Sequence, residues 1–170
     1  VYKVIEWKLA SVPKFIPYED ARRLISAVDR NTLKGKRDYL MLLLMLQLGL
    51  RANEVIQLRM EDIFLRKGEL FVRETKTNRE RVLPLTNELA DAIVDYLRHR
   101  QPETPQRHVF IRSVPPYTPL SCSSTLGTVV RKYIRETGIQ TPTFGTHQLR
   151  HTLATHLVNN GVSFKETADI

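Results

Sequence analysis

The chain has 170 residues, 42% of them hydrophobic and 26% charged, which are ordinary values for a globular protein with one core. Its net charge of +8 favours a polyanionic partner, first nucleic acid and second an anionic membrane surface. A single cysteine, Cys122, excludes an internal disulfide and fits a reducing compartment, so we expect a cytoplasmic protein.

The opening segment, residues 1–16, mixes apolar and charged positions with proline, and we interpret it as an interdomain linker. We expect residues 17–170 to form one domain. Apolar residues at helical spacing, with proline, glycine and polar caps at their ends, predict helices over 18–29, 36–48, 52–58, 87–100, 121–137 and 147–160, and a last one from residue 163. The apolar run at 39–48 is too short to span a bilayer and predicts a fully buried helix.

One region has the character of β-structure. Short apolar segments at 63–65, 69–73 and 81–84 are separated by turns at 66–68 and 76–78, which predicts a three-stranded meander. The fold class is therefore α+β, mainly helical with one small three-stranded antiparallel sheet. We interpret Cys122 as a small buried residue near a helix start, Asn87 as the cap of the helix that follows it, and Thr146 as the cap of the 147–160 helix.

The helix that begins near Thr146 combines a predicted apolar stripe (Leu149, Leu153, Ala154 and Leu157) with basic residues in its first turn. His147 and Arg150 are three positions apart and emerge side by side, where free N–H groups and the helix dipole already favour an anion. On helical spacing alone, a solvated face is by far the more common explanation of such a pair. A zinc site is disfavoured because Gln148 stands where the metalloprotease pattern requires glutamate.

Three sequence blocks together carry more information than any one of them. They are G-L-R-x-x-E at 49–54, K-x-N-x-E-R-x-x-P-L at 76–85 and H-x-L-R-H-T-x-A-T-H-L at 147–157. In this order and at these separations they resemble the tyrosine recombinase (phage integrase) family, over most of the chain. The resemblance implies the fold of a DNA breaking-and-rejoining catalytic domain, with duplex DNA as partner and no membrane.

The resemblance also implies a chemistry and assigns roles. In this family a tyrosine hydroxyl attacks a DNA phosphodiester and forms a 3′-phosphotyrosyl bond, without a metal or other cofactor. Fixed donors must then hold the charge of the transition state. By motif match the catalytic residues are Arg51, Lys76, His147 and Arg150, and the supporting residues are Glu54 and His151. The predicted ribbon from Arg66 to Arg81 holds six Lys/Arg and three Glu, so we expect it to lie against a phosphate backbone, with Arg79 and Arg81 as DNA-binding residues.

The nucleophile departs from the family pattern. All six tyrosines of the chain precede His147, whereas the family places its tyrosine after the last block. We therefore expect a catalytic domain truncated before the tyrosine. The full-length protein is expected to act as a homotetramer on DNA and to be associated with the nucleoid when bound. A DNA-binding module without cleavage activity, a basic helical interaction domain and a type IB topoisomerase are the alternatives.

Overall fold

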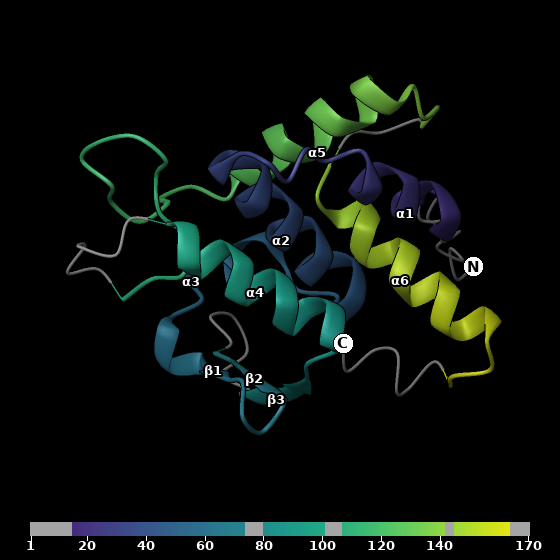
Figure 1. Ribbon diagram of the computed structural model, residues 1–170. Coiled ribbons are helices and arrows are strands. Elements are labelled where there is room, and N and C mark those ends of the chain that lie inside the picture. The colour runs from purple at the N-terminus through teal and green to yellow at the C-terminus, as the bar shows by residue number, and fades with distance from the viewer. Residues whose placement is uncertain (1–14, 74–79, 101–106, 142–144, 164–170) are drawn as a thin grey trace, which may run out of the picture.

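The computed structural model describes residues 15–73, 80–100, 107–141 and 145–163. In these ranges a three-stranded sheet lies at one edge of a group of helices (Figure 1), which confirms the predicted α+β class. The elements are α1 (Tyr18–Ser26), α2 (Leu33–Leu48), α3 (Ala52–Gln57), the 3-10 helix η1 (Met60–Asp62), β1 (Ile63–Phe64), β2 (Glu69–Val72), β3 (Arg81–Pro84), α4 (Asn87–His99), α5 (Ser124–Thr137) and α6 (His147–Asn159).

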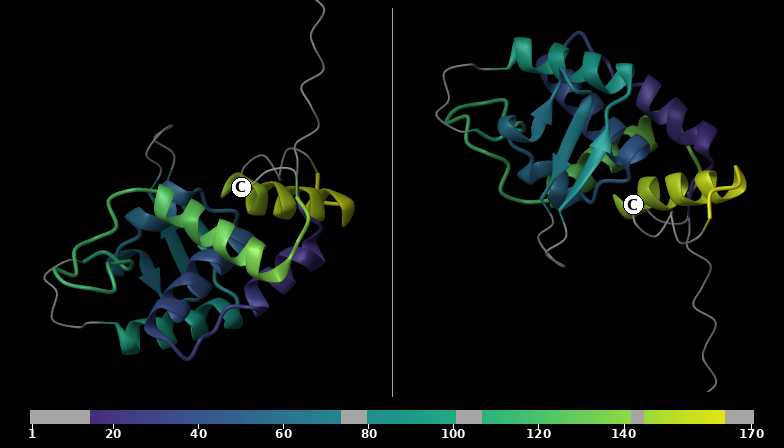
Figure 2. Two further views of the ribbon diagram at one scale, coloured as in Figure 1. Left: turned by 90° about the horizontal axis from the view of Figure 1, so that it is seen from above. Right: turned by 90° about the horizontal axis from the view of Figure 1, so that it is seen from below.

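Helix α2 is the centre of the molecule, as its apolar sequence predicts. Residues 37–46 are all buried, and α1, α4, α5 and α6 pack around them (Figures 1 and 2). The helix ends at Gly49, whose left-handed φ of 63° favours glycine. It begins at Leu33, three residues before the predicted start, because the Thr32 side chain caps it by accepting a hydrogen bond from Gly35 N at 3.0 Å.

The first turn of α2 packs closely against the segment that follows α1. A Cβ atom at Gly35 would lie 1.7 Å from the backbone oxygen of Asp29, so no larger residue fits without a shift of the main chain. Helix α1 ends at Ser26 and not at the predicted Asp29. The Asp29 side chain instead accepts hydrogen bonds from Asn31 in the connecting turn, which competes with helix continuation.

The sheet has the predicted meander topology, with strand order β1-β2-β3 and antiparallel pairing throughout. Ile63, Leu70 and Leu83 lie opposite one another on the face that packs against the helices, and Leu70 is fully buried. Gly68, at φ 67°, makes the turn between β1 and β2. Strands β1 and β2 are each one residue shorter than predicted. The predicted second turn, 76–78, lies outside the described residues.

Three predictions about helix starts are wrong in detail, although α4 and α6 begin at Asn87 and His147 as predicted. Thr86, and not Asn87, caps α4, because its hydroxyl accepts a hydrogen bond from Leu89 N at 3.2 Å. Thr146 has helical backbone angles and makes no capping hydrogen bond with its side chain. Helix α5 starts at Ser124, and Cys122 before it is exposed, contrary to the predicted burial.

Helix α6 buries a face slightly rotated from the predicted one. Leu149 and Leu153 are buried as expected, but Gln148 and Thr152 join them while Ala154 and Leu157 are half-buried. The polar members find partners there. Thr152 donates to the backbone oxygen of Ile16 at 2.8 Å, and Gln148 donates to the Thr141 hydroxyl at 2.7 Å. Periodicity finds the stripe but does not foresee these hydrogen bonds.

The two ends of the domain are only partly described. Ile16, the last residue of the predicted linker, is buried in the core, whereas residues 1–14 and the predicted helix from residue 163 lie almost entirely outside the described ranges. None of the helices seen in those ranges is both long enough and apolar enough to cross a membrane.

Candidate active site

The turn between α2 and α3 presents Arg51 to solvent. Gly49 ends α2, and Leu50 after it is buried in the core. Arg51 directly precedes α3 and has extended backbone angles. This places a fully buried residue directly before a side chain that is 42% exposed. The guanidinium therefore projects from a rigid support, as a site for a charged ligand requires.

Glu54 holds Arg51 in this position. Its carboxylate, with only 2% of the side chain exposed, accepts hydrogen bonds from the Arg51 backbone N–H at 2.7 Å and from Arg51 Nη1 at 3.0 Å. The same carboxylate accepts a hydrogen bond from Arg81 Nη2 at 2.9 Å. Arg81, predicted to bind DNA, thus lies in a buried ion pair with Glu54, and only 17% of its side chain is exposed.

Arg150 reaches this corner from α6. Its Nη1 donates a hydrogen bond to the backbone oxygen of Gly49, two positions before Arg51, although 101 residues separate Arg150 from Gly49 in sequence. The acceptor is free because Gly49 follows the last turn of α2, where carbonyls lack helical partners. The fold therefore brings the two motif arginines of the first and third blocks to the same corner.

Two of the three histidines of the third block, His147 and His151, are exposed on α6. His147 is the first residue of the helix and lies one turn before Arg150, and His151 directly follows Arg150. Among the described residues no group of three or more histidine, cysteine, aspartate or glutamate side chains could hold a metal ion. Arginine and histidine side chains, with the Glu54 carboxylate, are what the described residues place at this corner.

Lys76 and Arg79, predicted as catalytic and DNA-binding residues, lie outside the described residues. The strands on either side of them are described, and each is tied to a buried carboxylate. Arg73 follows β2 and contacts Asp62 through Nε at 2.8 Å and Nη2 at 2.7 Å, while Arg81 on β3 contacts Glu54. The sequence interpretation missed Asp62. Asp62 lies three residues after Arg59 and accepts a hydrogen bond from the Arg59 backbone N–H at 3.0 Å. Glu54 has the same spacing from Arg51, and this repeated spacing could have identified Asp62 from the sequence.

The described corner suits a phosphate group. Arginine guanidinium groups stay charged and can donate two parallel hydrogen bonds to phosphate oxygens. The start of α6 adds a positive dipole end close to Arg150. Together these groups can bind a phosphodiester and stabilise additional negative charge on it.

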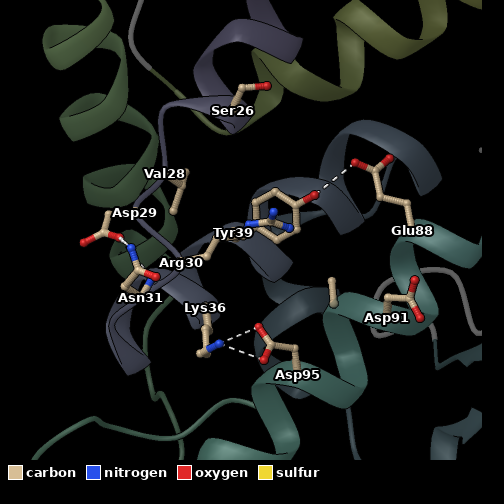
Figure 3. Close-up of a pocket in the computed structure, with 11 residues that line it drawn as sticks. Ser26, Val28, Asp29, Arg30, Asn31, Lys36, Tyr39, Glu88, Asp91 and Asp95 are labelled. Atoms are coloured by element: carbon tan, nitrogen blue, oxygen red, sulfur yellow. Dashed lines mark hydrogen bonds and ion pairs between the residues drawn. The ribbon is translucent and has the colours of Figure 1, made fainter.

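A cavity of about 810 Å³ lies elsewhere, between the segment after α1 and helices α2 and α4 (Figure 3), and none of the predicted site residues lines it. It is largely acidic, with Asp29, Glu88, Asp91 and Asp95 in its wall. Lys36 pairs with Asp95 at 2.7 Å. An acidic wall repels phosphate, so this cavity is not part of the corner at Arg51.

Glu88 forms the main polar contact between the helices at this cavity. Arg22 of α1, Tyr39 of α2 and Gln47 of α2 donate hydrogen bonds to it at 3.1, 2.9 and 2.6 Å. Burial alone would raise the pKa of the Glu88 carboxyl, but these hydrogen bonds outweigh it and hold the pKa below its ordinary value. The ionised carboxylate therefore joins α1, α2 and α4.

The domain is mainly helical with a three-stranded sheet and a corner of two arginines, and comparison with known proteins specifies its family. Residues 14–170 match the model of the phage integrase family. The Sinorhizobium fredii protein y4rA, which is named as an integrase/recombinase, is 40% identical over 98% of this chain. The tyrosine recombinase XerA of Pyrococcus furiosus is 33% identical over 91% of it. The chain belongs to the phage integrase family, that of the tyrosine recombinases.

Solved structures agree on the fold. A crystal structure of XerA recombinase superimposes with a TM-score of 0.77 at 25% identity and covers 92% of this chain. The XerH recombinase bound to its difH substrate, in a pre-cleavage complex, gives the same TM-score at 19% identity. The chain spans 40% of the length of y4rA, 51% of the P. furiosus XerA sequence and 46% of the XerH chain.

Proposed function

We propose that this chain is the catalytic domain of a site-specific recombinase that cleaves and rejoins duplex DNA through a 3′-phosphotyrosyl intermediate. The observation that carries the proposal is the corner at Gly49, where Arg150 of α6 meets the segment that presents Arg51. The names of the relatives, and the solved complex of XerH with its DNA substrate, support the same reaction.

The proposed reaction needs charge stabilisation and two proton transfers: the attacking tyrosine hydroxyl gives up a proton, which His147 can take, and the departing 5′-oxygen gains one. A tyrosine hydroxyl forms a bond to phosphorus while the bond to the 5′-oxygen breaks, and negative charge builds on the non-bridging oxygens. Arg51 and Arg150 donate hydrogen bonds to those oxygens, and His147 assists them. Lys76 gives its proton to the departing 5′-oxygen. In the reverse step the 5′-hydroxyl of the partner strand attacks, which exchanges the strands without a cofactor.

The remaining roles follow from the same proposal. Glu54 orients Arg51, and His151 supports the histidine of the first turn. Arg79 contacts the DNA backbone. The full-length protein works as a tetramer on two duplexes, in the cytoplasm and on the nucleoid.

Covalent capture on a nicked suicide substrate tests the proposal. The full-length protein should give a protein–DNA adduct, and the 170-residue chain alone should give none because its six tyrosines all precede His147. Arg150→Ala in the full-length protein should slow adduct formation by about 10²–10³-fold, the usual effect of losing one preorganised donor.

A sulfur substitution isolates the role of Lys76. When the leaving 5′-oxygen is replaced by sulfur, Lys76→Ala should slow cleavage less, because a thiolate leaves without an acid, whereas Arg150→Ala should remain slow. A full-length protein that binds DNA and never forms the adduct would identify a DNA-binding module without cleavage activity.

A further inference from the structure

Glu54 serves two arginines at once, and the second one has no role in the reaction proposed above. Oε2 accepts hydrogen bonds from the Arg51 backbone N–H at 2.7 Å and from Arg81 Nη2 at 2.9 Å, while Oε1 accepts from Arg51 Nη1 at 3.0 Å. Only 2% of the Glu54 side chain is exposed, so its carboxylate needs hydrogen-bond donors and a positive charge nearby. Arg81 supplies the more buried of the two charges.

Arg81 is poorly placed to bind phosphate itself. Its Nη2 is engaged with Glu54, its Nε is buried without a hydrogen-bond partner among the described residues, and 17% of its side chain is exposed against 42% for Arg51. The strand register explains this position. Arg81 pairs with the buried Val72 on the inner face of the sheet, so its side chain points toward α3 and not outward.

We propose that Arg81 is a positioning residue that acts through Glu54 to hold the Arg51 guanidinium in its observed orientation; the proposal rests on the role of Arg51 proposed above. Both arginines contact the same carboxylate. Without Arg81 this buried carboxylate loses one donor and its more buried counter-charge, and the Arg51 guanidinium shifts toward it. The orientation of Arg51 at the corner then changes.

A double-mutant cycle in duplex DNA binding tests this inference. Arg51→Ala and Arg81→Gln should each weaken binding, Arg51→Ala on the order of tenfold as expected for a hydrogen bond to a charged group. The double variant should bind no more weakly than Arg51→Ala, and with the same salt dependence. If Arg81 made its own phosphate contact, the losses would add and the slope of log K against log salt would fall by about one more unit. That result would overturn the inference.

Two further variants separate positioning from loss of structure. Arg73→Gln breaks the matched pair with Asp62 on the neighbouring strand of the same sheet, and it should leave DNA affinity within about twofold. Arg81→Lys keeps the charge and should recover most of the affinity lost in Arg81→Gln. Two results would show that the sheet as a whole, and not the position of Arg51, controls DNA affinity. One is an equal loss of affinity in Arg73→Gln; the other is an Arg81→Lys variant as weak as Arg81→Gln at equal thermal stability.

A measurement without DNA makes the inference independent of the proposed reaction. The side-chain N–H resonances of Arg51 in the free protein should shift in Arg81→Gln and stay in place in Arg73→Gln. Unchanged Arg51 resonances in Arg81→Gln would refute the coupling through Glu54. If those resonances shift while Arg51→Ala leaves DNA binding intact, the proposed role of Arg51 fails and the positioning by Arg81 stands.

Discussion

Cys122 is exposed and hydrogen-bonded to Ser124, which the sequence did not predict. The sulfur is exposed just before α5 and lies 2.9 Å from the Ser124 hydroxyl. Hydrogen bonds from the side chain and then from the backbone N–H of Ser124 lower the pKa of the thiol. We therefore predict fast labelling of the folded protein by a disulfide reagent near pH 7.5, since the thiolate is the reactive form.

Ser124→Ala should raise the pKa of this thiol and slow the labelling, as a pH–rate profile would record. Cys122→Ser provides the blank. Labelling that requires denaturant would contradict the exposed position.

The roles of single residues differ in how far the sequence discloses them. Arg51, Glu54 and Arg150 are found through short motifs, because their spacing within a helix turn is local. The pairing of Arg81 with Glu54 spans 27 positions and two elements. Only the strand register determines which way Arg81 points, and a shift of one residue would have turned it to solvent. Its interpretation as a DNA contact followed from charge alone.

At the scale of elements, the first turn of α2 requires glycine at position 35. Gly35→Ala should destabilise the protein by about 1–3 kcal/mol, the usual cost of inserting a methyl group where the backbone cannot yield, because its Cβ would lie 1.7 Å from the Asp29 oxygen. The urea midpoint measures this. Gly127→Ala in α5 is the matched control. The nearest atom to its Cβ is Arg131 Nη2 at 3.6 Å, so it should stabilise by about 0.5–1 kcal/mol.

The Glu88 network predicts how the contacts among α1, α2 and α4 respond to acid. A carboxyl whose folded pKa is lowered from 4.5 contributes stability that is present above that value and is lost as pH falls through the folded pKa. Glu88→Gln should cost about 1 kcal/mol at neutral pH, allowing for partial exposure. Its urea midpoint should fall less than that of the wild type between pH 5 and pH 3.

Asp91→Asn, at an exposed position of the same helix, is the reference for Glu88→Gln. A variant that loses stability with acid as steeply as the wild type would show that Glu88 does not carry the effect.

The sequence predicted every described α-helix and most helix ends to within one residue; the exceptions are the end of α1 and the starts of α2 and α5. The apolar run at 39–48 and the periodicity of α4 and α5 locate these helices within a few residues. The start of α2 moved because of one side-chain cap at Thr32, and the end of α1 because Asp29 bonds its neighbours. Such contacts are worth about 1 kcal/mol each, which decides a boundary and leaves the helix itself unchanged.

For the whole molecule, the net charge of +8 predicts the mode of DNA binding. The chain should bind duplexes with little sequence preference, through phosphate contacts. If about six to ten phosphates are contacted, affinity should fall by orders of magnitude between about 50 and 200 mM salt. Fluorescence anisotropy with two unrelated duplexes of equal length measures both properties. Binding that ignores salt would show that the charge is incidental, and would favour a basic interaction domain.

The order of elements and the family follow from the sequence, because motifs and periodicity are local signals. The acidic cavity between α1, α2 and α4 does not, because it depends on how three helices cross. Counting charges gives only the net charge of the chain. The fold instead separates an acidic cavity wall from a corner of arginines, so net charge alone predicts the partner but not the surface that meets it.

The hydrogen bond from Arg150 to Gly49 can form only after both residues have been synthesised. It joins positions 101 residues apart, so at about 5–20 residues per second the ribosome adds the second arginine roughly 5–20 seconds after the first has been made. During that interval the nascent chain carries Arg51 without its partner. A chain released before residue 150 would therefore hold only the Arg51 half of this corner.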